Sequence, residues 1–232
     1  MKLLALDTSS EGCSAALLID DELTERFERA PRGHTRLLMP MVRELLSAQA
    51  LTPSDLDALA FACGPGSFTG LRIATGVVQG LAWGLERPVV PVSSLAAVAY
   101  GAIQEAAVAE GDGVAVAIDA RMDEVYWGCF RCHQGLPEAV AEERVCPPSQ
   151  VALPETVKSW IGVGAGWHYQ DRMPGGVRER VVSVDTGMTV RAAWVARLAQ
   201  GAAEAGRTVP AAQAQPVYLR DEVAWKKLPG RG

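Results

Sequence analysis

The sequence predicts an α/β fold built as two similar lobes, and two observations carry this prediction. The chain has 232 residues, of which 49% are hydrophobic, enough for one large core or two lobes of about 100 residues each. An apolar strand ending in an aspartate, then a polar turn and a second strand, occurs at residues 3–19 and again at 113–130. A repeated hairpin-led unit favours a duplicated fold with one sheet in each lobe.

The first lobe is expected to open with a hairpin of two apolar strands joined by the polar turn DTSSEG. The following segments show the apolar spacing of helices or the short apolar runs of strands. In chain order they are an acidic connector after residue 19, a helix at 36–49, a strand at 56–63 stopped by Gly-Pro-Gly, a helix at 69–85, a strand at 89–94 and a helix around 95–109.

The second lobe repeats the hairpin at 113–130, with Asp119 where the first lobe has Asp7. We expect a strand and Gly-rich turn at 159–167, a helix at 189–205 and a linker at 210–216. The predicted lobes are therefore 1–105, the N-terminal lobe with its dimerisation helices, and 106–232, the C-terminal lobe. The last helix and the tail are expected to pack back on the N-terminal lobe.

This plan resembles the actin-like, sugar-kinase and Hsp70 superfamily, which has a ribonuclease H-like fold. In that superfamily the Asp-bearing turns of both lobes face a cleft that holds the phosphates of ATP. The residues that would form a vestigial nucleotide cleft are Asp7, Thr8, Ser9, Asp119 and Gly164. An ordinary polar hairpin turn explains the first turn equally well, and Arg121 and Met122 are too bulky for a phosphate turn in the second. Likeness of fold gives no activity by itself.

Composition argues against several functions. The formal net charge is −5, so the chain lacks the basic surface that proteins use to bind nucleic acid without a partner. The apolar run after Lys2 is too short for a signal peptide or a membrane span, so a cytoplasmic protein with reduced cysteines is expected. Its histidines, His34, His133 and His168, are isolated, and no nucleophile elbow occurs. We therefore expect no metal, no cofactor and no catalytic residue.

The string GPGSFTGLR at 64–72 is best explained as a tight turn and helix N-cap, because it lacks the GK[ST] ending of a P-loop. Three glycines in the helix after it recur every four residues, and each costs about 1 kcal/mol relative to alanine. A close neighbour must offset that cost, either within this chain or from a second subunit. The broad apolar face of 36–49 favours the second subunit. The candidate partner interface is Leu37, Leu38, Met41, Leu45, Ile73, Gly76, Val77, Gly80, Leu81 and Gly84.

The strings GPGSFTGLR, MKLLALDTSS, PVVPVSSL, IDARMDEVYW and PVYLR together resemble the TsaB (YeaZ) family, whose catalytic relative is TsaD. The resemblance implies a non-catalytic subunit that activates TsaD in threonylcarbamoyl transfer to N6 of adenosine 37, in tRNAs that read codons beginning with A. TsaD carries two metal-binding histidines where this chain has Ser94 and Val98, so the catalytic site does not carry over. The implied partners are TsaD, through the helices at 34–49 and 69–85, the ATPase TsaE and a second copy, with tRNA bound only through the complex and no membrane.

Two other functions stay open on the sequence alone. One is an enzyme, either an ATP-dependent phosphotransferase of the sugar-kinase kind or a metallopeptidase, but a second small-residue phosphate turn and a ligand cluster are both missing. The other is a homodimeric nucleotide-binding module that uses the first Asp turn and the GVGAG segment. Stoichiometric nucleotide binding by the isolated protein would favour this module over a scaffold.

Overall fold

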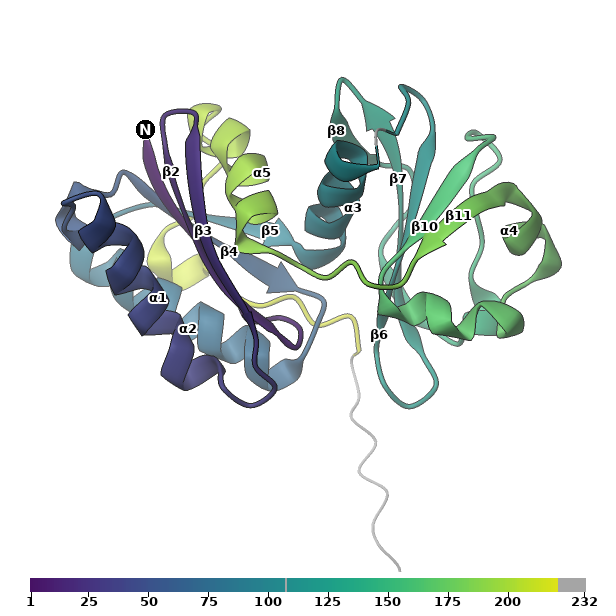
Figure 1. Ribbon diagram of the computed structural model, residues 1–232, viewed down its shortest axis with the longest axis horizontal. Helices are drawn as coiled ribbons and strands as arrows, with labels where there is room; N and C mark the ends of the chain where they lie inside the picture. Colours follow the sequence, from purple (N-terminus) through teal and green to yellow (C-terminus); the bar gives the residue numbers. More distant parts are fainter. Residues whose placement is uncertain (107, 221–232) are drawn as a thin grey trace, which may run out of the picture.

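The computed structural model describes residues 1–106 and 108–220, which form two mixed β-sheets flanked by helices (Figure 1). One sheet has the strand order β3-β2-β1-β4-β5 and the other β11-β10-β6-β7-β8. In each sheet an antiparallel hairpin, β1-β2 or β6-β7, is joined on its first strand by a parallel strand, β4 or β10. The predicted duplicated, two-lobed α/β fold is confirmed.

The N-terminal lobe opens with the expected hairpin, in which Leu3 pairs with Leu18 and Asp7 with Ser14. Its central strands are buried on both faces because helices cover each side. Its elements are β1 (Lys2–Asp7), β2 (Gly12–Ile19), β3 (Glu22–Arg29), α1 (His34–Ala48), η1 (Pro53–Asp55), β4 (Ala58–Gly64), α2 (Phe68–Leu85), β5 (Val89–Ser93) and α3 (Ser94–Glu105).

The acidic connector expected after residue 19 is wrong in part, because Glu22–Arg29 forms strand β3. Its sequence ELTERFER has no clean alternation of apolar and polar residues, since the strand lies at the edge of the sheet and is only half buried. Charged side chains on an edge strand also discourage pairing with other chains. The charges that suggested a connector are therefore those of a protected sheet edge.

The C-terminal lobe has its own apolar core, in which Trp127, Trp160 and Trp167 are almost fully buried. Its elements are β6 (Gly113–Asp119), β7 (Val125–His133), β8 (Leu136–Ala139), β9 (Arg144–Cys146), η2 (Pro148–Gln150), β10 (Trp160–Val163), η3 (Ala165–Arg172), α4 (Gly175–Arg180) and β11 (Val181–Asp185). Strands β8, β9 and β11 and helix α4, none of them predicted, are short, and β8, β11 and α4 are mostly exposed.

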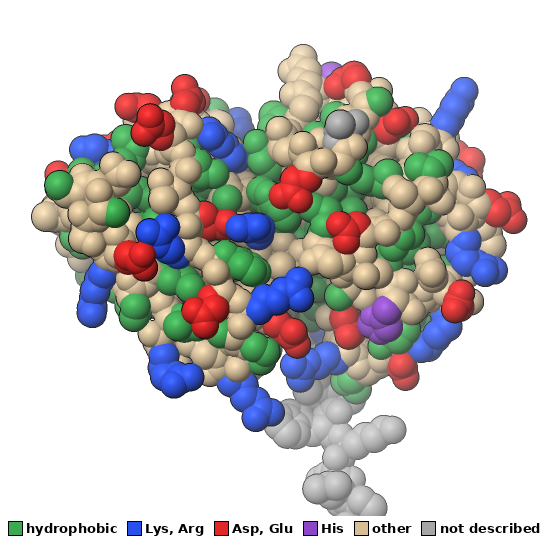
Figure 2. Space-filling view, viewed as in Figure 1, with side chains coloured by type: hydrophobic (Ala, Val, Ile, Leu, Met, Phe, Trp, Pro, Cys, Tyr) green, Lys and Arg blue, Asp and Glu red, His purple; other side chains and the backbone are tan. Residues whose placement is uncertain are grey.

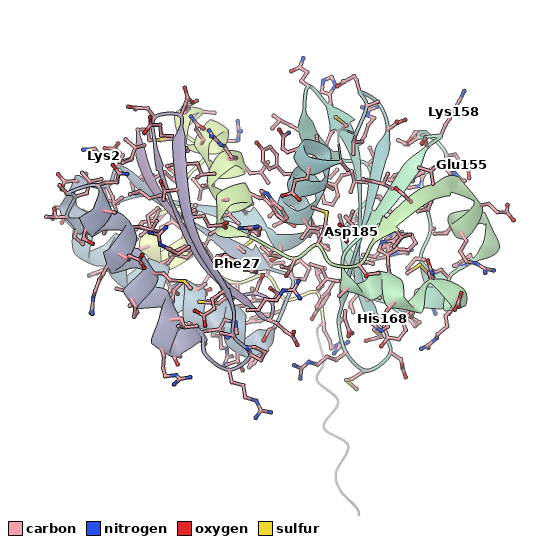
Figure 3. All side chains as sticks on the ribbon, viewed as in Figure 1. Lys2, Phe27, Glu155, Lys158, His168 and Asp185 are labelled. Atoms are coloured by element: carbon pink, nitrogen blue, oxygen red, sulfur yellow. The ribbon has the colours of Figure 1, made fainter. Side chains whose placement is uncertain are left out.

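After β11 the chain crosses back to the N-terminal lobe, where α5 (Ala192–Glu204) packs on β1, β2 and β4 (Figure 1). The crossing is held by Arg191, whose guanidinium pairs with Glu25 and lies 4.8 Å from the ring centroid of Phe27. Phe27 on β3 and Asp185 at the end of β11 mark the two sides of this crossing (Figure 3). Helices α3 and α5 share one apolar cluster that fills the space between the sheets.

Residues 208–218, here called the C-terminal strap, run along the N-terminal lobe beside α2 and include η4 (Ala211–Gln213) (Figure 1). Val209 and Val89 exchange two backbone hydrogen bonds, and Val217 N–H donates to the Cys63 carbonyl over 2.7 Å. Ala211 and Ala214 enter the same apolar core as α1 and α2. The strap thus supports the flank of α2 that α1 leaves uncovered.

Gln79 provides a direct test of this support. Its Nε2 donates to the Ala214 carbonyl over 2.9 Å in a partly buried position. Gln79→Ala is expected to lower the free energy of unfolding by about 1 kcal/mol, since the carbonyl loses its donor. Gln104→Ala, which removes an exposed bond of the same type to Gly135, is expected to cost less. Urea unfolding of both variants measures the difference, and equal losses would contradict a supporting role for the strap.

Candidate functional site

Helices α1 and α2 cover one face of the N-terminal sheet, and the inner side of α1 belongs to the lobe's own core. Leu38, Met41 and Leu45 are buried against strands and helices of this chain. Their assignment to a partner interface is therefore wrong, because helical periodicity marks an apolar side without saying whose core it faces. Leu37 is only half buried and remains at the rim of this core.

The outer side of α2 gives the opposite result. Gly76, Gly80 and Gly84 are exposed, and a Cβ atom built on any of them would meet no atom within 4 Å. Ala74, Val78 and Ala82 form the inner side and are buried. The glycine stripe therefore has no packing reason inside the described part of this chain. We name Gly76, Gly80, Gly84 and the half-buried Ile73, Val77 and Leu81 the glycine face.

The glycine face keeps its helical geometry in spite of the glycines, because both ends of α2 are capped. Ser67 Oγ accepts from Gly70 N–H at the start, and Glu86 adopts a left-handed conformation, φ 54°, at the end. Trp83, which was not among the expected interface residues, is 73% exposed beside the stripe. Small residues flanked by large apolar ones allow another helix to approach closely.

An apolar pocket of about 220 Å³ opens between α1 and α2 next to the glycine face. Leu81 lines it together with Met39 and Leu46 of α1, and Leu51 and Leu56 close its far wall. Nearly all of its lining surface is apolar, which suits an apolar side chain of a docking partner better than a polar ligand.

The first Asp turn, by contrast, is filled by the protein itself. Ser9 donates to Asp7 Oδ1 through its amide (2.9 Å) and its hydroxyl (2.6 Å), and Thr8 Oγ1 donates to the Gly70 carbonyl over 2.6 Å. A Cβ on Gly70 would lie 1.9 Å from the Thr8 carbonyl oxygen, and one on Gly66 2.5 Å from that of Ser9. The loop before α2 and the start of α2 thus pack directly against this turn.

Asp7 is fully buried, and desolvation raises the pKa of its carboxyl to about 6 against the hydrogen bonds from Ser9. Its Oδ2 has no hydrogen-bond partner among the described residues. The carboxyl therefore holds the turn in place through its hydrogen bonds. The folded chain disfavours its ionised form.

The second Asp turn and the Gly-rich turn are separate from the first. Asp119 is exposed and accepts from Arg121 N–H over 2.7 Å, and no hydrogen bond among the described residues joins it to the Asp7 turn. Gly164 has φ +100°, and a Cβ there would lie 2.4 Å from the Ala117 carbonyl oxygen. The space next to Gly162 is filled by the indole of Trp167. Close packing within the lobe explains these glycines without an adenosine.

Groups suited to nucleophilic or metal chemistry are buried or scattered. Burial raises the pKa of the thiols of Cys13, Cys63 and Cys129 to about 12, so they are poor nucleophiles at neutral pH. Ser94 and Val98 are buried at the start of α3. Within 1–106 and 108–220, no cluster of three or more His, Cys, Asp or Glu residues is arranged to hold a metal ion. Nor does any helix in this part of the chain have the length and apolarity needed to cross a membrane.

Comparison with known proteins agrees with the assignment from sequence motifs. Residues 27–165 match the family model described as TsaD: tRNA N6-adenosine threonylcarbamoyltransferase. The tRNA threonylcarbamoyladenosine biosynthesis protein TsaB of Escherichia coli K12 is 40% identical over the full length of both chains. That of Haemophilus influenzae is 38% identical over 100% of this chain and 98% of its own. The solved structure of YeaZ from Pseudomonas aeruginosa aligns with a TM-score of 0.88 at 48% identity, covering 94% of this chain and 99% of the other.

Proposed function

The chain belongs to the TsaB family of tRNA threonylcarbamoyladenosine biosynthesis proteins, and from this premise we propose that it is a non-catalytic scaffold. In this proposal it binds TsaD and activates the transfer of threonylcarbamoyl to N6 of adenosine 37 in tRNAs that read codons beginning with A. A homodimer through the same surface is the form expected of the isolated protein. TsaE joins the complex as its ATPase, and the assembly works in the cytoplasm.

The glycine face is the observation that carries the proposal. A helix interior with three glycines is less stable than one with three alanines by up to about 3 kcal/mol, and no close contact within the described chain offsets this loss. A partner helix that packs against the stripe would offset it, and the pocket at Leu81 would take an apolar side chain of that partner. The proposed interface is therefore Leu37 and the glycine face, with Trp83 at its edge.

The absence of a catalytic role rests on two features. Serine and valine at positions 94 and 98 cannot replace metal-binding imidazoles, and the first Asp turn is filled by the loop before α2. Binding of tRNA through the complex agrees with the surface, on which basic and acidic side chains are interspersed without one large basic patch on the face shown (Figure 2). We therefore assign most of the tRNA contact to the partners.

Reconstituted threonylcarbamoyl transfer tests the proposal. Purified TsaD, TsaE and the adenylate-forming enzyme are given unmodified tRNA with this chain absent, present, or carrying Val77→Glu and Leu81→Glu. Product is expected only with the wild-type chain, because two charges on the glycine face would be buried without partners. Leu136→Glu, at an exposed apolar position on β8, is the matched control and is expected to behave as wild type. Equal product without the chain would refute the scaffold role.

A further inference from the structure

One acidic side chain of the C-terminal lobe reaches the N-terminal sheet and is partly buried there. Glu143 lies in the loop between β8 and β9, and its Oε1 accepts from the Ser93 hydroxyl over 2.5 Å. Ser93 is the last residue of β5, which forms one edge of the N-terminal sheet. This hydrogen bond therefore joins the two lobes directly, between residues fifty positions apart in the chain.

The carboxylate of Glu143 depends on this one contact. Desolvation raises the pKa of its carboxyl, against the hydrogen bond from Ser93. Burial, and after it the charge of Glu143, raises the pKa of the Cys63 thiol, which lies near the end of β4. None of the ion pairs within residues 1–106 and 108–220 includes Glu143. Since burying a carboxylate is unfavourable unless bonds offset it, the Ser93 hydroxyl is what stabilises Glu143 in this position.

Ser93 is also the joint between the N-terminal sheet and α3. Strand β5 ends at Ser93 and α3 begins at Ser94, so no linker residue separates them. The Ser93 Oγ accepts from the amides of Leu95 and Ala96, over 3.1 and 3.2 Å, and so caps the helix. The positive end of the helix dipole also favours a carboxylate at this place. One hydroxyl thus holds the start of α3 and the C-terminal lobe together.

The joint matters because the chain passes between the two sheets at only a few places. It passes once through α3, which lies between the sheets and packs more extensively on β6, β7 and β8 than on β4 and β5 (Figure 1). It passes back through residues 186–191, before α5. The apolar cluster between the sheets resists their separation, but apolar contact is non-directional and tolerates sliding of packed elements. A directed hydrogen bond at the joint is therefore needed to fix the angle.

We propose that Glu143 is a latch that fixes the angle between the two lobes by holding Ser93 at the joint. The pair of Arg191 with Glu25 anchors residues 186–191 to β3 but reaches no strand of the C-terminal sheet, so it leaves this angle free. Arg220 does pair with Glu124 of the C-terminal lobe, but it lies at the end of the strap and not at a joint. A latched chain presents both lobes to a binding partner as one preorganised surface.

Distances between spin labels on the two lobes test the latch. The labels are attached to Thr35→Cys on α1 and Arg178→Cys on α4, exposed positions on helices at opposite ends of the molecule (Figure 1). The five native cysteines are buried, so the labels react at the new positions. Labelled full-length chain is diluted with unlabelled chain, so that only distances within one molecule are measured. Wild type is expected to give one narrow distance distribution, and Glu143→Ala is expected to increase its width at least about twofold.

Further variants separate a latch from a contact that only stabilises the fold. Glu143→Gln keeps an oxygen that accepts from Ser93 and is expected to keep the narrow distribution. Glu143→Asp withdraws the carboxylate by one methylene and is expected to broaden it, which decides the question if the alanine variant does not fold. Glu138→Ala, which breaks an exposed pair with Arg131 inside the C-terminal lobe, is the control and is expected to match wild type. Unchanged widths in the folded alanine and aspartate variants would overturn the latch, even if their free energy of unfolding falls. Broadening by Glu138→Ala would overturn it as well.

Discussion

Replacing Gly80 by leucine is expected to abolish binding to TsaD while leaving the fold intact or slightly more stable. A Cβ at this position meets no atom within 4 Å in this chain, so the larger side chain extends into open space. Removing a glycine from a helix interior stabilises it by about 0.5–1 kcal/mol. In the complex the same side chain would separate the two helices, and a loss of affinity of at least about 100-fold, or about 3 kcal/mol, is expected.

Gly201 offers a matched control for this change. It is an exposed glycine inside α5, and a Cβ there also meets nothing within 4 Å. Gly201→Leu is expected to raise the free energy of unfolding by a similar amount and to leave TsaD affinity unchanged. Titration calorimetry for binding and urea unfolding for stability give the two readouts. If both variants bound TsaD like wild type, the glycine face would not be the interface.

The candidate interface residues divide between those that the structure leaves exposed and those that it buries in this chain. Glycine spacing pointed to the outer side of α2, because three glycines at helical spacing are costly unless something packs against them, and the structure leaves this side exposed. For α1 the pattern was misleading, since Leu38, Met41 and Leu45 face the sheet of their own lobe. Apolar periodicity marks the side of a helix that leaves water, but it does not distinguish an internal core from a partner.

The fold was predictable where apolar runs are long and less so where strands are exposed. Strands β1, β2, β4 and β6 lie largely buried between layers, so their sequences are plainly apolar. The edge strands β3 and β11 are half buried or exposed and read as polar segments. Short strands of this kind are specified by pairing with neighbours rather than by their own residues. The sequence therefore predicted the central strands of the two sheets, but not the edge strands.

The candidate nucleotide cleft shows a different limit of prediction from sequence. The Asp7 turn has the small hydroxyl residues that a phosphate would need, yet its hydroxyls bond to Asp7 and to the Gly70 carbonyl. The contact from Thr8 to Gly70 joins residues about sixty positions apart in the chain, so a local sequence pattern does not predict it. Gly66 and Gly70 are explained by close approach of two backbones, one of several uses of glycine that a sequence alone does not separate.

Asp7 gives the second large expected effect, on the pH dependence of stability. Burial raises the pKa of its carboxyl in the folded state to about 6, against an ordinary value of 3.8. Well below pH 3.8 the carboxyl is protonated in both the folded and the unfolded chain, and its burial carries no ionisation penalty. As the pH rises from about 3.8 to about 6 the unfolded chain releases this proton first, so stability falls. Well above pH 6 the full penalty applies, about 3 kcal/mol from the gap of about two pH units.

Asp7→Asn removes this titration while keeping the shape of the turn. Its carbonyl oxygen can still accept from Ser9, and its uncharged amide replaces the unpartnered Oδ2 at a cost of about 1–3 kcal/mol that does not depend on pH. Urea unfolding between pH 4 and 7.5 is therefore expected to show the variant at a disadvantage at pH 4 and to show that disadvantage shrinking by about 2–3 kcal/mol toward pH 7. Asp119→Asn, at an exposed carboxylate, is expected to run parallel to wild type. If the Asp7→Asn curve ran parallel as well, ionisation of this buried carboxyl would carry no penalty, and its Oδ2 would have to reach water or a donor.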